Sequence, residues 1–185
     1  MTPSDLVVPT YVQMLGALSK WLDKAAAQRP ADEADALLAS RLAPDMFPLA
    51  TQIRFACRQA QEGVFRLAEQ DFPPALQTLL DEGRNAGDRP GTLADAQARI
   101  AETLAVVEAT VGAIAIESSA PIAHALPNGM TLDLTAEQYA RDWALPQFYF
   151  HVVTAYAILR AEGIELGKAD YAAHMIGYFR PPAAS

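Results

Sequence analysis

The sequence predicts an all-α fold, a four-helix bundle with a small β-hairpin inserted before the last long helix. Three observations lead to this fold class. Long segments carry apolar residues at alternating steps of three and four, which is the spacing of one helix face. Prolines and glycines separate these segments. One short stretch instead alternates apolar and small or polar residues around a Pro-Asn-Gly turn, as hairpin strands do.

The first helix begins at Thr2-Pro3-Ser4-Asp5. Thr2 can cap the helix, the fixed backbone angle of Pro3 suits the first turn, and the Asp5 carboxylate can accept a hydrogen bond from the cap amide. The apolar face that follows consists of Val8, Tyr11, Leu15, Leu18, Leu22 and Ala25.

The second helix is predicted at about residues 46–70, after an acidic connector from Pro30 to Pro44 that contains one short helix. Phe72-Pro73-Pro74 ends it, because neither proline can continue a helix. The polar, glycine-rich stretch from Asp81 to Gly91 predicts an exposed loop. The buried stripe of the helix is Ile53, Ala56, Cys57, Ala60, Val64 and Leu67.

The third helix starts at a second capping box, Thr92 to Asp95, and ends before Pro121. Its apolar positions again alternate in steps of three and four. Three helices with one apolar face each need a fourth to close the core. The stripe comprises Leu93, Ala96, Ile100, Leu104, Val107, Val111 and Ile114.

The hairpin and the fourth helix complete the chain. Two alternating stretches flank the turn Pro127-Asn128-Gly129 and predict the hairpin. A capping box at Thr135 to Gln138 starts a short helix toward Trp143, and Pro146 opens the last long helix. Gly163 has the position of a helix C-cap. The buried line of the last helix is Phe148, Val152, Ala155 and Leu159.

Composition limits the function classes. A chain of 185 residues with 51% hydrophobic residues suits a single domain over residues 1–185. The net charge of −8, with scattered basic residues, argues against a nucleic-acid partner. No apolar run has the length of a membrane span, and the start of the chain does not look like a signal peptide. With Cys57 as the single cysteine, we expect a cytoplasmic protein.

The strongest candidate for a site is His151, which lies in an otherwise apolar, aromatic segment from Ala144 to Arg160. We expect its ring to be hydrogen-bonded to a polar group from the second helix, because buried polar groups normally have partners. Contact with a ligand is the alternative. Tyr156 and Arg160 lie one turn apart on the same helix and could form the polar end of a pocket.

The motifs Leu145 to His151, Thr154 to Arg160, Gly163 to Lys168 and Asp170-Tyr171 resemble a bacterial domain-of-unknown-function family, DUF1993. That family looks like a branch of the DinB/YfiT-like superfamily of four-helix bundles. The resemblance covers nearly the whole chain and includes Met46 to Leu49 with Gln52.

The resemblance implies a DinB-like bundle, often dimeric, and in many members a divalent metal on three histidines. One histidine comes from the second helix and two lie one turn apart on the fourth. Here Gln147 and Ala155 flank His151 at that spacing, and the second helix offers Gln52 but no histidine. The metal site is therefore degenerate in this sequence. His124 and His174 could join His151 only if the hairpin and the tail fold over the last helix.

The leading hypothesis is a homodimer that binds a small ligand or partner near His151, with Gln52, Tyr156 and Arg160 as further contact residues. We assign no catalytic residue, metal or cofactor, because no nucleophile elbow or buried carboxylate pair is evident. Cys57 lies in an apolar stripe, where a thiol is normally inert. The alternatives are a divalent-metal enzyme with a degenerate site and an interaction module without a ligand.

Overall fold

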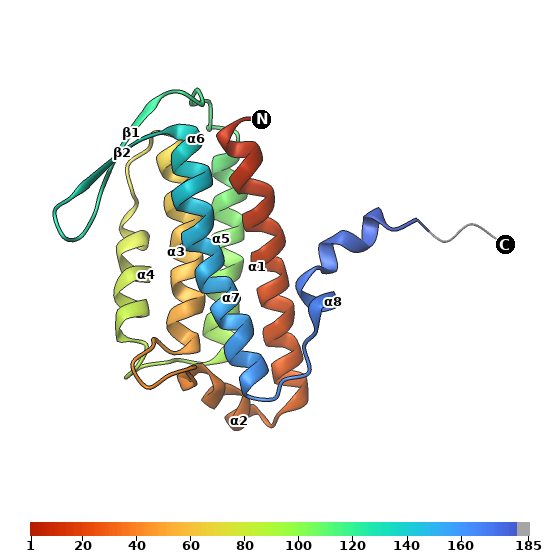
Figure 1. Cartoon of the computed structure of the whole chain (residues 1–185). Coiled ribbons are helices and arrows are strands. Elements are labelled where there is room, and N and C mark those ends of the chain that lie inside the picture. The colour runs from red at the N-terminus through yellow and green to blue at the C-terminus, as the bar shows by residue number, and fades with distance from the viewer. Residues whose placement is uncertain (181–185) are drawn as a thin grey trace.

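A computed structural model describes residues 1–180, and four long helices packed side by side form its body (Figure 1). The predicted helical bundle with an inserted hairpin is confirmed. The second helix is shorter at both ends than the predicted range. The four helices are α1 (Pro3–Gln28), α3 (Leu49–Leu67), α5 (Leu93–Val111) and α7 (Leu145–Ala161).

Shorter elements connect and extend these helices. The connector after α1 contains the predicted short helix, and the hairpin comes before the last long helix, as predicted. These elements are α2 (Ala31–Ala36) with a 3-10 turn (Leu37–Ala39), α4 (Pro74–Asn85), β1 (Pro121–Ala125), β2 (Thr131–Thr135), α6 (Ala136–Gln138) with a π-helical turn (Tyr139–Ala144), and α8 (Lys168–Tyr171) with a 3-10 helix (Ala173–Tyr178).

The core is continuous between the long helices and contains most residues of the predicted stripes, although Val8, Leu104 and Ile114 are only partly buried and Val111 is exposed. Large aromatic side chains fill its centre, with Trp21, Tyr11 and Phe148 fully buried. The rings of Tyr11 and Phe148 meet edge to face with centroids 4.8 Å apart, a favoured aromatic geometry. The core thereby joins α1 to α7 and places the segment around His151 against α3.

The loop predicted from Asp81 to Gly91 is wrong in its first part, because α4 continues to Asn85. The helix starts at a proline and turns Leu76 and Leu79 toward α3. Gly83 is buried on the same side and packs against the ring of Phe55. The missing side chain at this position allows α3 and α4 to approach each other closely, and the glycine does not mark a turn.

The last long helix begins at Leu145 with Pro146 in its first turn, as predicted, but it is not separate from the short helix before it, since α6, the π-helical turn and α7 form one uninterrupted helical run. The N–H of Leu145 donates to the carbonyl of Ala140, five residues earlier. This wider turn accommodates the proline ring, which would clash in a regular α-helix interior. The capping box at Thr135 is present as predicted and starts the run.

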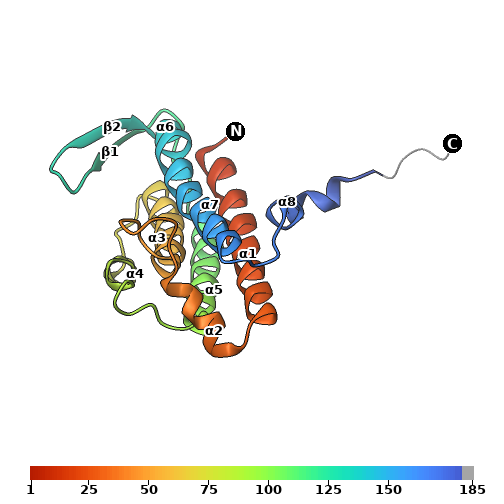
Figure 2. The same ribbon diagram turned by 60° about the horizontal axis from the view of Figure 1, so that its bottom comes forward.

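The hairpin extends beyond the bundle on the side where α4 lies (Figures 1 and 2). Its strands pair antiparallel from Pro121 opposite Thr135 to Ala125 opposite Thr131. Gly129 has φ +85° and closes the turn through its N–H to Leu126. The hairpin can therefore cover the surface of α3 next to α4.

The chain leaves the bundle after α7 at a glycine cap, as predicted. The N–H of Gly163 donates to the carbonyl of Arg160, and the N–H of Ile164 donates to the carbonyl of Leu159. These two hydrogen bonds define a Schellman motif. Elements α8 and the last 3-10 helix then extend on the side opposite the hairpin (Figure 2). Among residues 1–180, no helix combines the length and the apolar character that crossing a membrane requires.

Candidate functional site

His151 lies on α7 and points at α3, with 8% of its surface exposed. Its Nδ1 atom is 2.9 Å from the Oε1 atom of Gln52, which confirms the predicted hydrogen bond to the second long helix. The Nε2 atom of Gln52 donates to the carbonyl of Phe47 at 3.1 Å. Because that bond fixes the amide orientation, Gln52 Oε1 accepts and His151 Nδ1 carries the proton. The lone pair of His151 Nε2 remains available as an acceptor.

Aromatic rings surround this imidazole. The rings of Phe55 and Phe150 lie edge-on to it, each with a centroid distance of 5.3 Å, and Phe47 packs against Phe55. Phe47 and Phe150 remain half exposed. Burial, together with the nearby positive charge of Arg58, lowers the pKa of His151 to about 4. The site thus holds a neutral imidazole framed by two exposed aromatic edges.

The four predicted contact residues do not form one cluster. Gln52 and His151 lie together, whereas Tyr156 packs against Trp21 and Tyr171 at ring distances of 5.2 and 6.0 Å. Arg160 donates to the carbonyl of Leu166 and supports the chain after α7. Tyr156 and Arg160 therefore belong to the junction between α7, α1 and the C-terminal segment.

The three histidines do not converge either. His124 lies against Tyr139 and Trp143, His151 lies against phenylalanines, and His174 is exposed in the C-terminal segment. Within residues 1–180, no group of three or more His, Cys, Asp or Glu side chains is arranged to hold a metal ion. The side chains around His151 do not fit the three-histidine set that the resemblance implies, because its neighbour is a carboxamide already engaged by Phe47.

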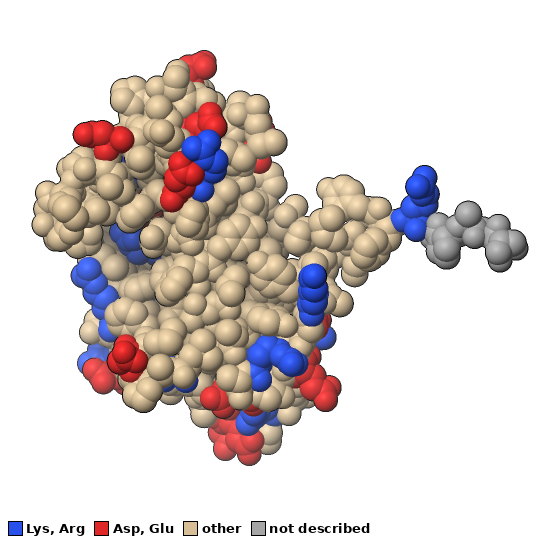
Figure 3. Space-filling view, in the orientation of Figure 1, with Lys and Arg blue, Asp and Glu red and all other residues tan. Residues whose placement is uncertain are grey.

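A hollow of about 390 Å³ under the hairpin was not predicted from the sequence. Figure 3 shows basic atoms recessed between the hairpin and the bundle. Glu62 lines this hollow and is 5% exposed. Arg58 Nη1 lies 2.7 Å and Arg66 Nη2 lies 3.5 Å from the Glu62 carboxylate. The spacing of four residues between Arg58, Glu62 and Arg66 was the one sign of this cluster in the sequence. The spacing could not show that the cluster is buried, because the hairpin that covers it lies far along the chain. The lining comprises Arg58, Gln59, Glu62, His124, Ala125, Leu126, Pro127 and Trp143.

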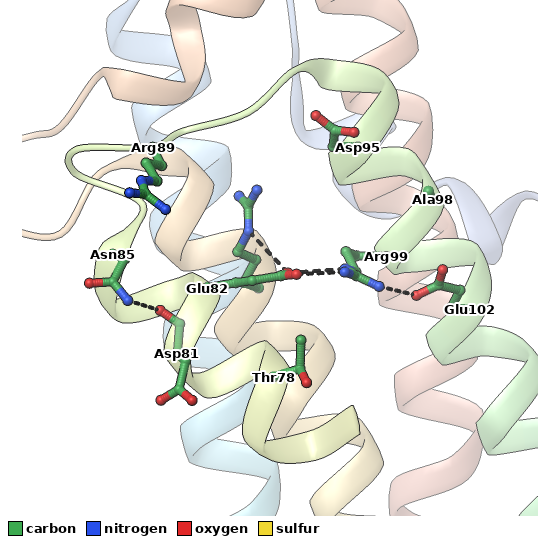
Figure 4. A pocket seen from close by; sticks show the side chains of 10 residues that line it. Thr78, Asp81, Glu82, Asn85, Arg89, Asp95, Ala98, Arg99 and Glu102 are labelled. Carbon is green, nitrogen blue, oxygen red and sulfur yellow. Dashed lines mark hydrogen bonds and ion pairs between the residues drawn. The ribbon is translucent and has the colours of Figure 1, made fainter. Parts of the chain in front are cut away.

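A larger cavity, about 660 Å³, lies between α3, α4 and α5 and is lined by charged side chains, several of which form ion pairs with one another (Figure 4). The guanidinium of Arg99 donates hydrogen bonds to both carboxylate oxygens of Glu82 and a third, of 2.7 Å, to Glu102. Arg54 approaches Glu82 from α3, with its Nε atom 3.7 Å away. Hydrogen bonds from Thr92 lower the pKa of Asp95, whose carboxylate caps α5. This network fastens α4 to the bundle.

A four-helix bundle with a hairpin before its last long helix defines a DinB-like helical protein. The fold is similar to the crystal structure of a DinB family member protein from Shewanella denitrificans, with a TM-score of 0.75 and 34% sequence identity, covering 97% of this chain and 95% of that one. Residues 4–172 match the family model described as Domain of unknown function (DUF1993), and the chain belongs to that family. A search of curated proteins finds no match.

Proposed function

We propose that the protein binds a small ligand at the His151 surface, which we define as Phe47, Gln52, Phe55, Phe150 and His151. The observation that carries the proposal is the hydrogen-bonded chain from Phe47 through Gln52 to His151, which fixes the imidazole tautomer beneath half-exposed aromatic rings. Such a fixed polar group within an apolar frame is typical of small-molecule sites.

The chemistry of this surface favours a neutral or donor-bearing ligand. His151 Nε2 has no hydrogen-bond partner among residues 1–180 and offers an acceptor, since Nδ1 carries the proton. The half-exposed rings of Phe150, next to His151, and of Phe47, next to Phe55, offer apolar contact. The expected ligand donates one hydrogen bond to the imidazole and covers the two rings with an apolar body.

The test is a fragment screen by protein-detected NMR on the wild type and on His151→Ala, with His174→Ala as the matched control. Fragments that contact the His151 surface should lose at least about tenfold in affinity in the His151 variant, because a buried hydrogen bond and ring contact disappear together. The exposed His174 should be replaceable without effect. Equal binding to all three proteins, or no binding at this surface, would contradict the proposal.

We further propose that the protein is a homodimer. Support comes from the exposed apolar side chains of Ile176, Tyr178 and Phe179 on a segment that extends away from the bundle, and from Val12 and Val153 on α1 and α7. Figure 3 shows few charges on the face over α7. In a dimer with two-fold symmetry, the C-terminal segment of each copy can pack on the apolar face of α1 and α7 of the other copy.

Sedimentation velocity tests the dimer. The double variant Tyr178→Ser/Phe179→Ser should shift the protein from dimer to monomer, whereas Met130→Ser, which removes an exposed apolar side chain from the hairpin, should leave the dimer intact. A wild type that remains monomeric at high concentration would refute the assignment.

A cytoplasmic location belongs to the same proposal. Its support is the composition, with one cysteine whose buried thiol has no disulfide partner. Fractionation of the source cells, with the protein followed by antibody, tests it, and recovery outside the cytoplasm would contradict it.

A further inference from the structure

The hollow under the hairpin carries an inference of its own, which does not depend on the His151 surface. Glu62 is a carboxylate with 5% of its surface exposed, and it is shared by two guanidinium groups. Burying such a charge is costly unless ions and hydrogen bonds compensate it. The fold therefore has to compensate the charge of Glu62, and it does so with the two arginines beside the hollow.

Polar atoms of this cluster are left without hydrogen-bond partners. The Nε atoms of Arg58 and Arg66 and the Nδ1 atom of His124 are buried and have no hydrogen-bond partner within residues 1–180. His124 is 5% exposed, and its Nδ1 atom lies 3.9 Å from Glu62, beyond hydrogen-bond distance. An arginine Nε–H can only donate, so the missing partner is an acceptor.

The charges around the hollow favour an anionic acceptor. Two guanidinium groups contact the Glu62 carboxylate, Arg58 from the lining of the hollow and Arg66 from beside it, and no other carboxylate pairs with them among residues 1–180. Glu69 and Asp71 line a neighbouring depression beside Arg66 but form no ion pair with it. Hydrogen bonds from a guanidinium to a carboxylate are about twice as strong as neutral ones.

The opposite wall of the hollow is apolar. Trp143 lines it together with Leu126 and Pro127 from the hairpin, and the Trp143 ring lies 4.7 Å from the His124 ring. The volume of about 390 Å³ is at the lower end of the range of small-molecule pockets. A flat ring can lie along Trp143 while an acidic group reaches the arginine.

We propose that this hollow binds a small organic monoanion, a carboxylate on a flat apolar body, with Arg58 as its anchor, His124 as a second polar contact and Trp143 as the stacking wall. The site takes Arg58 from α3, and His124 and its cover from the hairpin. It is separate from the His151 surface, although Arg58 lies close enough to influence that histidine electrostatically.

The experiment uses phenylacetate as the probe and phenylacetamide as its neutral counterpart, with binding followed by calorimetry. Phenylacetate should bind saturably, and the amide about tenfold more weakly or not at all, since the charge on the acceptor is the difference. Arg58→Met should lose about tenfold or more of the affinity for phenylacetate. Arg84→Met removes the same charge from an exposed position on α4 and should change nothing.

Two further variants separate this site from the other proposal and from a folding defect. Trp143→Leu should weaken phenylacetate binding while keeping the arginine, and His151→Ala should leave it unchanged. Thermal unfolding shows whether each variant is folded. Equal binding of acid and amide, full affinity in Arg58→Met or Trp143→Leu, or no saturable binding of phenylacetate would overturn the proposal. Loss of binding in His151→Ala alone would do so too.

Discussion

At the scale of single residues, the environment of His151 decides its charge. The folded-state pKa is about 4, compared with 6.5 for an unperturbed histidine, because the ring is buried. Between these two values the unfolded chain binds a proton that the folded protein does not. The free energy of unfolding therefore decreases as the pH falls from about 6.5 to about 4, by at most about 3 kcal/mol, and the contribution is constant above and below this window.

Urea unfolding of the wild type and His151→Gln at pH 7.5 and pH 4.5 checks this prediction. Glutamine stays neutral, so the variant should lose less stability on acidification than the wild type. The lowered pKa of His124, which also results from burial, affects both proteins equally and cancels in the difference. The same pH dependence in both proteins would show that His151 is not buried in a neutral form.

Cys57 is predicted to be unreactive in the folded protein. Burial raises the pKa of its thiol to about 12, so the nucleophilic thiolate is nearly absent at pH 8. Iodoacetamide at pH 8 should leave the folded protein unlabelled and should label one site per chain after denaturation in urea. Stoichiometric labelling without urea would show that the thiol is accessible.

At the scale of elements, the contact between α3 and α4 depends on a glycine. A Cβ atom at Gly83 would collide with the ring of Phe55, and the carbonyl of Gly83 accepts a hydrogen bond from Thr51 at 2.8 Å. Gly83→Ala should therefore lower the free energy of unfolding by about 1–3 kcal/mol, the usual cost of overpacking.

Gly16, inside α1, provides the matched control, since a Cβ atom there would meet nothing within 4 Å. Gly16→Ala should raise stability by about 0.5–1 kcal/mol, because alanine restricts the unfolded chain and favours the helix. Chemical denaturation of both variants measures the two effects. Equal effects of the same sign would mean that α4 does not pack as closely as described.

The elements that the sequence predicted well are those with local signals. Capping boxes at Thr2, Thr92 and Thr135 and the glycine cap at Gly163 all lie where expected, because each motif is complete within a few residues. Helix α4 was not predicted, and its last part was assigned to a loop because Gly83 has the same local signature in a loop and in a close helix contact. The continuous helical run from α6 into α7 depends on a π-helical turn, which no residue spacing in the sequence predicts.

The candidate sites show the same division. The hydrogen bond between His151 and α3 could be predicted because a buried imidazole needs a polar partner, and α3 has several buried polar residues, of which Gln52 is the one in contact. The hollow requires Arg58 and Glu62 of α3 to meet Trp143 and the hairpin, more than 60 residues later by sequence number. No local pattern encodes that encounter, and the arginine–glutamate spacing alone is typical of a solvated helix face.

At the scale of the whole molecule, the chain carries two extensions on opposite sides of one bundle (Figures 1 and 2). The hairpin covers charged residues of α3, whereas the C-terminal segment covers an aromatic residue of α1. Trp21 is fully buried, its ring stacks on Tyr171 at 5.9 Å, and its Nε1 donates to the carbonyl of Asp170 at 3.3 Å. Lys24 adds an ion pair with Asp170 at 2.6 Å.

These contacts predict where the folded unit ends. A chain ending at Ala172 keeps α8 and should unfold at nearly the same temperature as the full chain, in agreement with the family match over residues 4–172. A chain ending at Gly167 loses Tyr171 and the hydrogen bond to Asp170. It should lose about 1–3 kcal/mol, because an aromatic contact and a buried hydrogen bond disappear together.

Tryptophan fluorescence distinguishes the two truncated chains, since removal of α8 uncovers Trp21 and should shift its emission to longer wavelength. If the dimer forms through Tyr178 and Phe179, both truncated chains should be monomers, and only the shorter one should be destabilised. Equal unfolding temperatures of the two chains would show that α8 does not stabilise the bundle. A dimer that persists at Ala172 would instead locate the interface on the helices themselves.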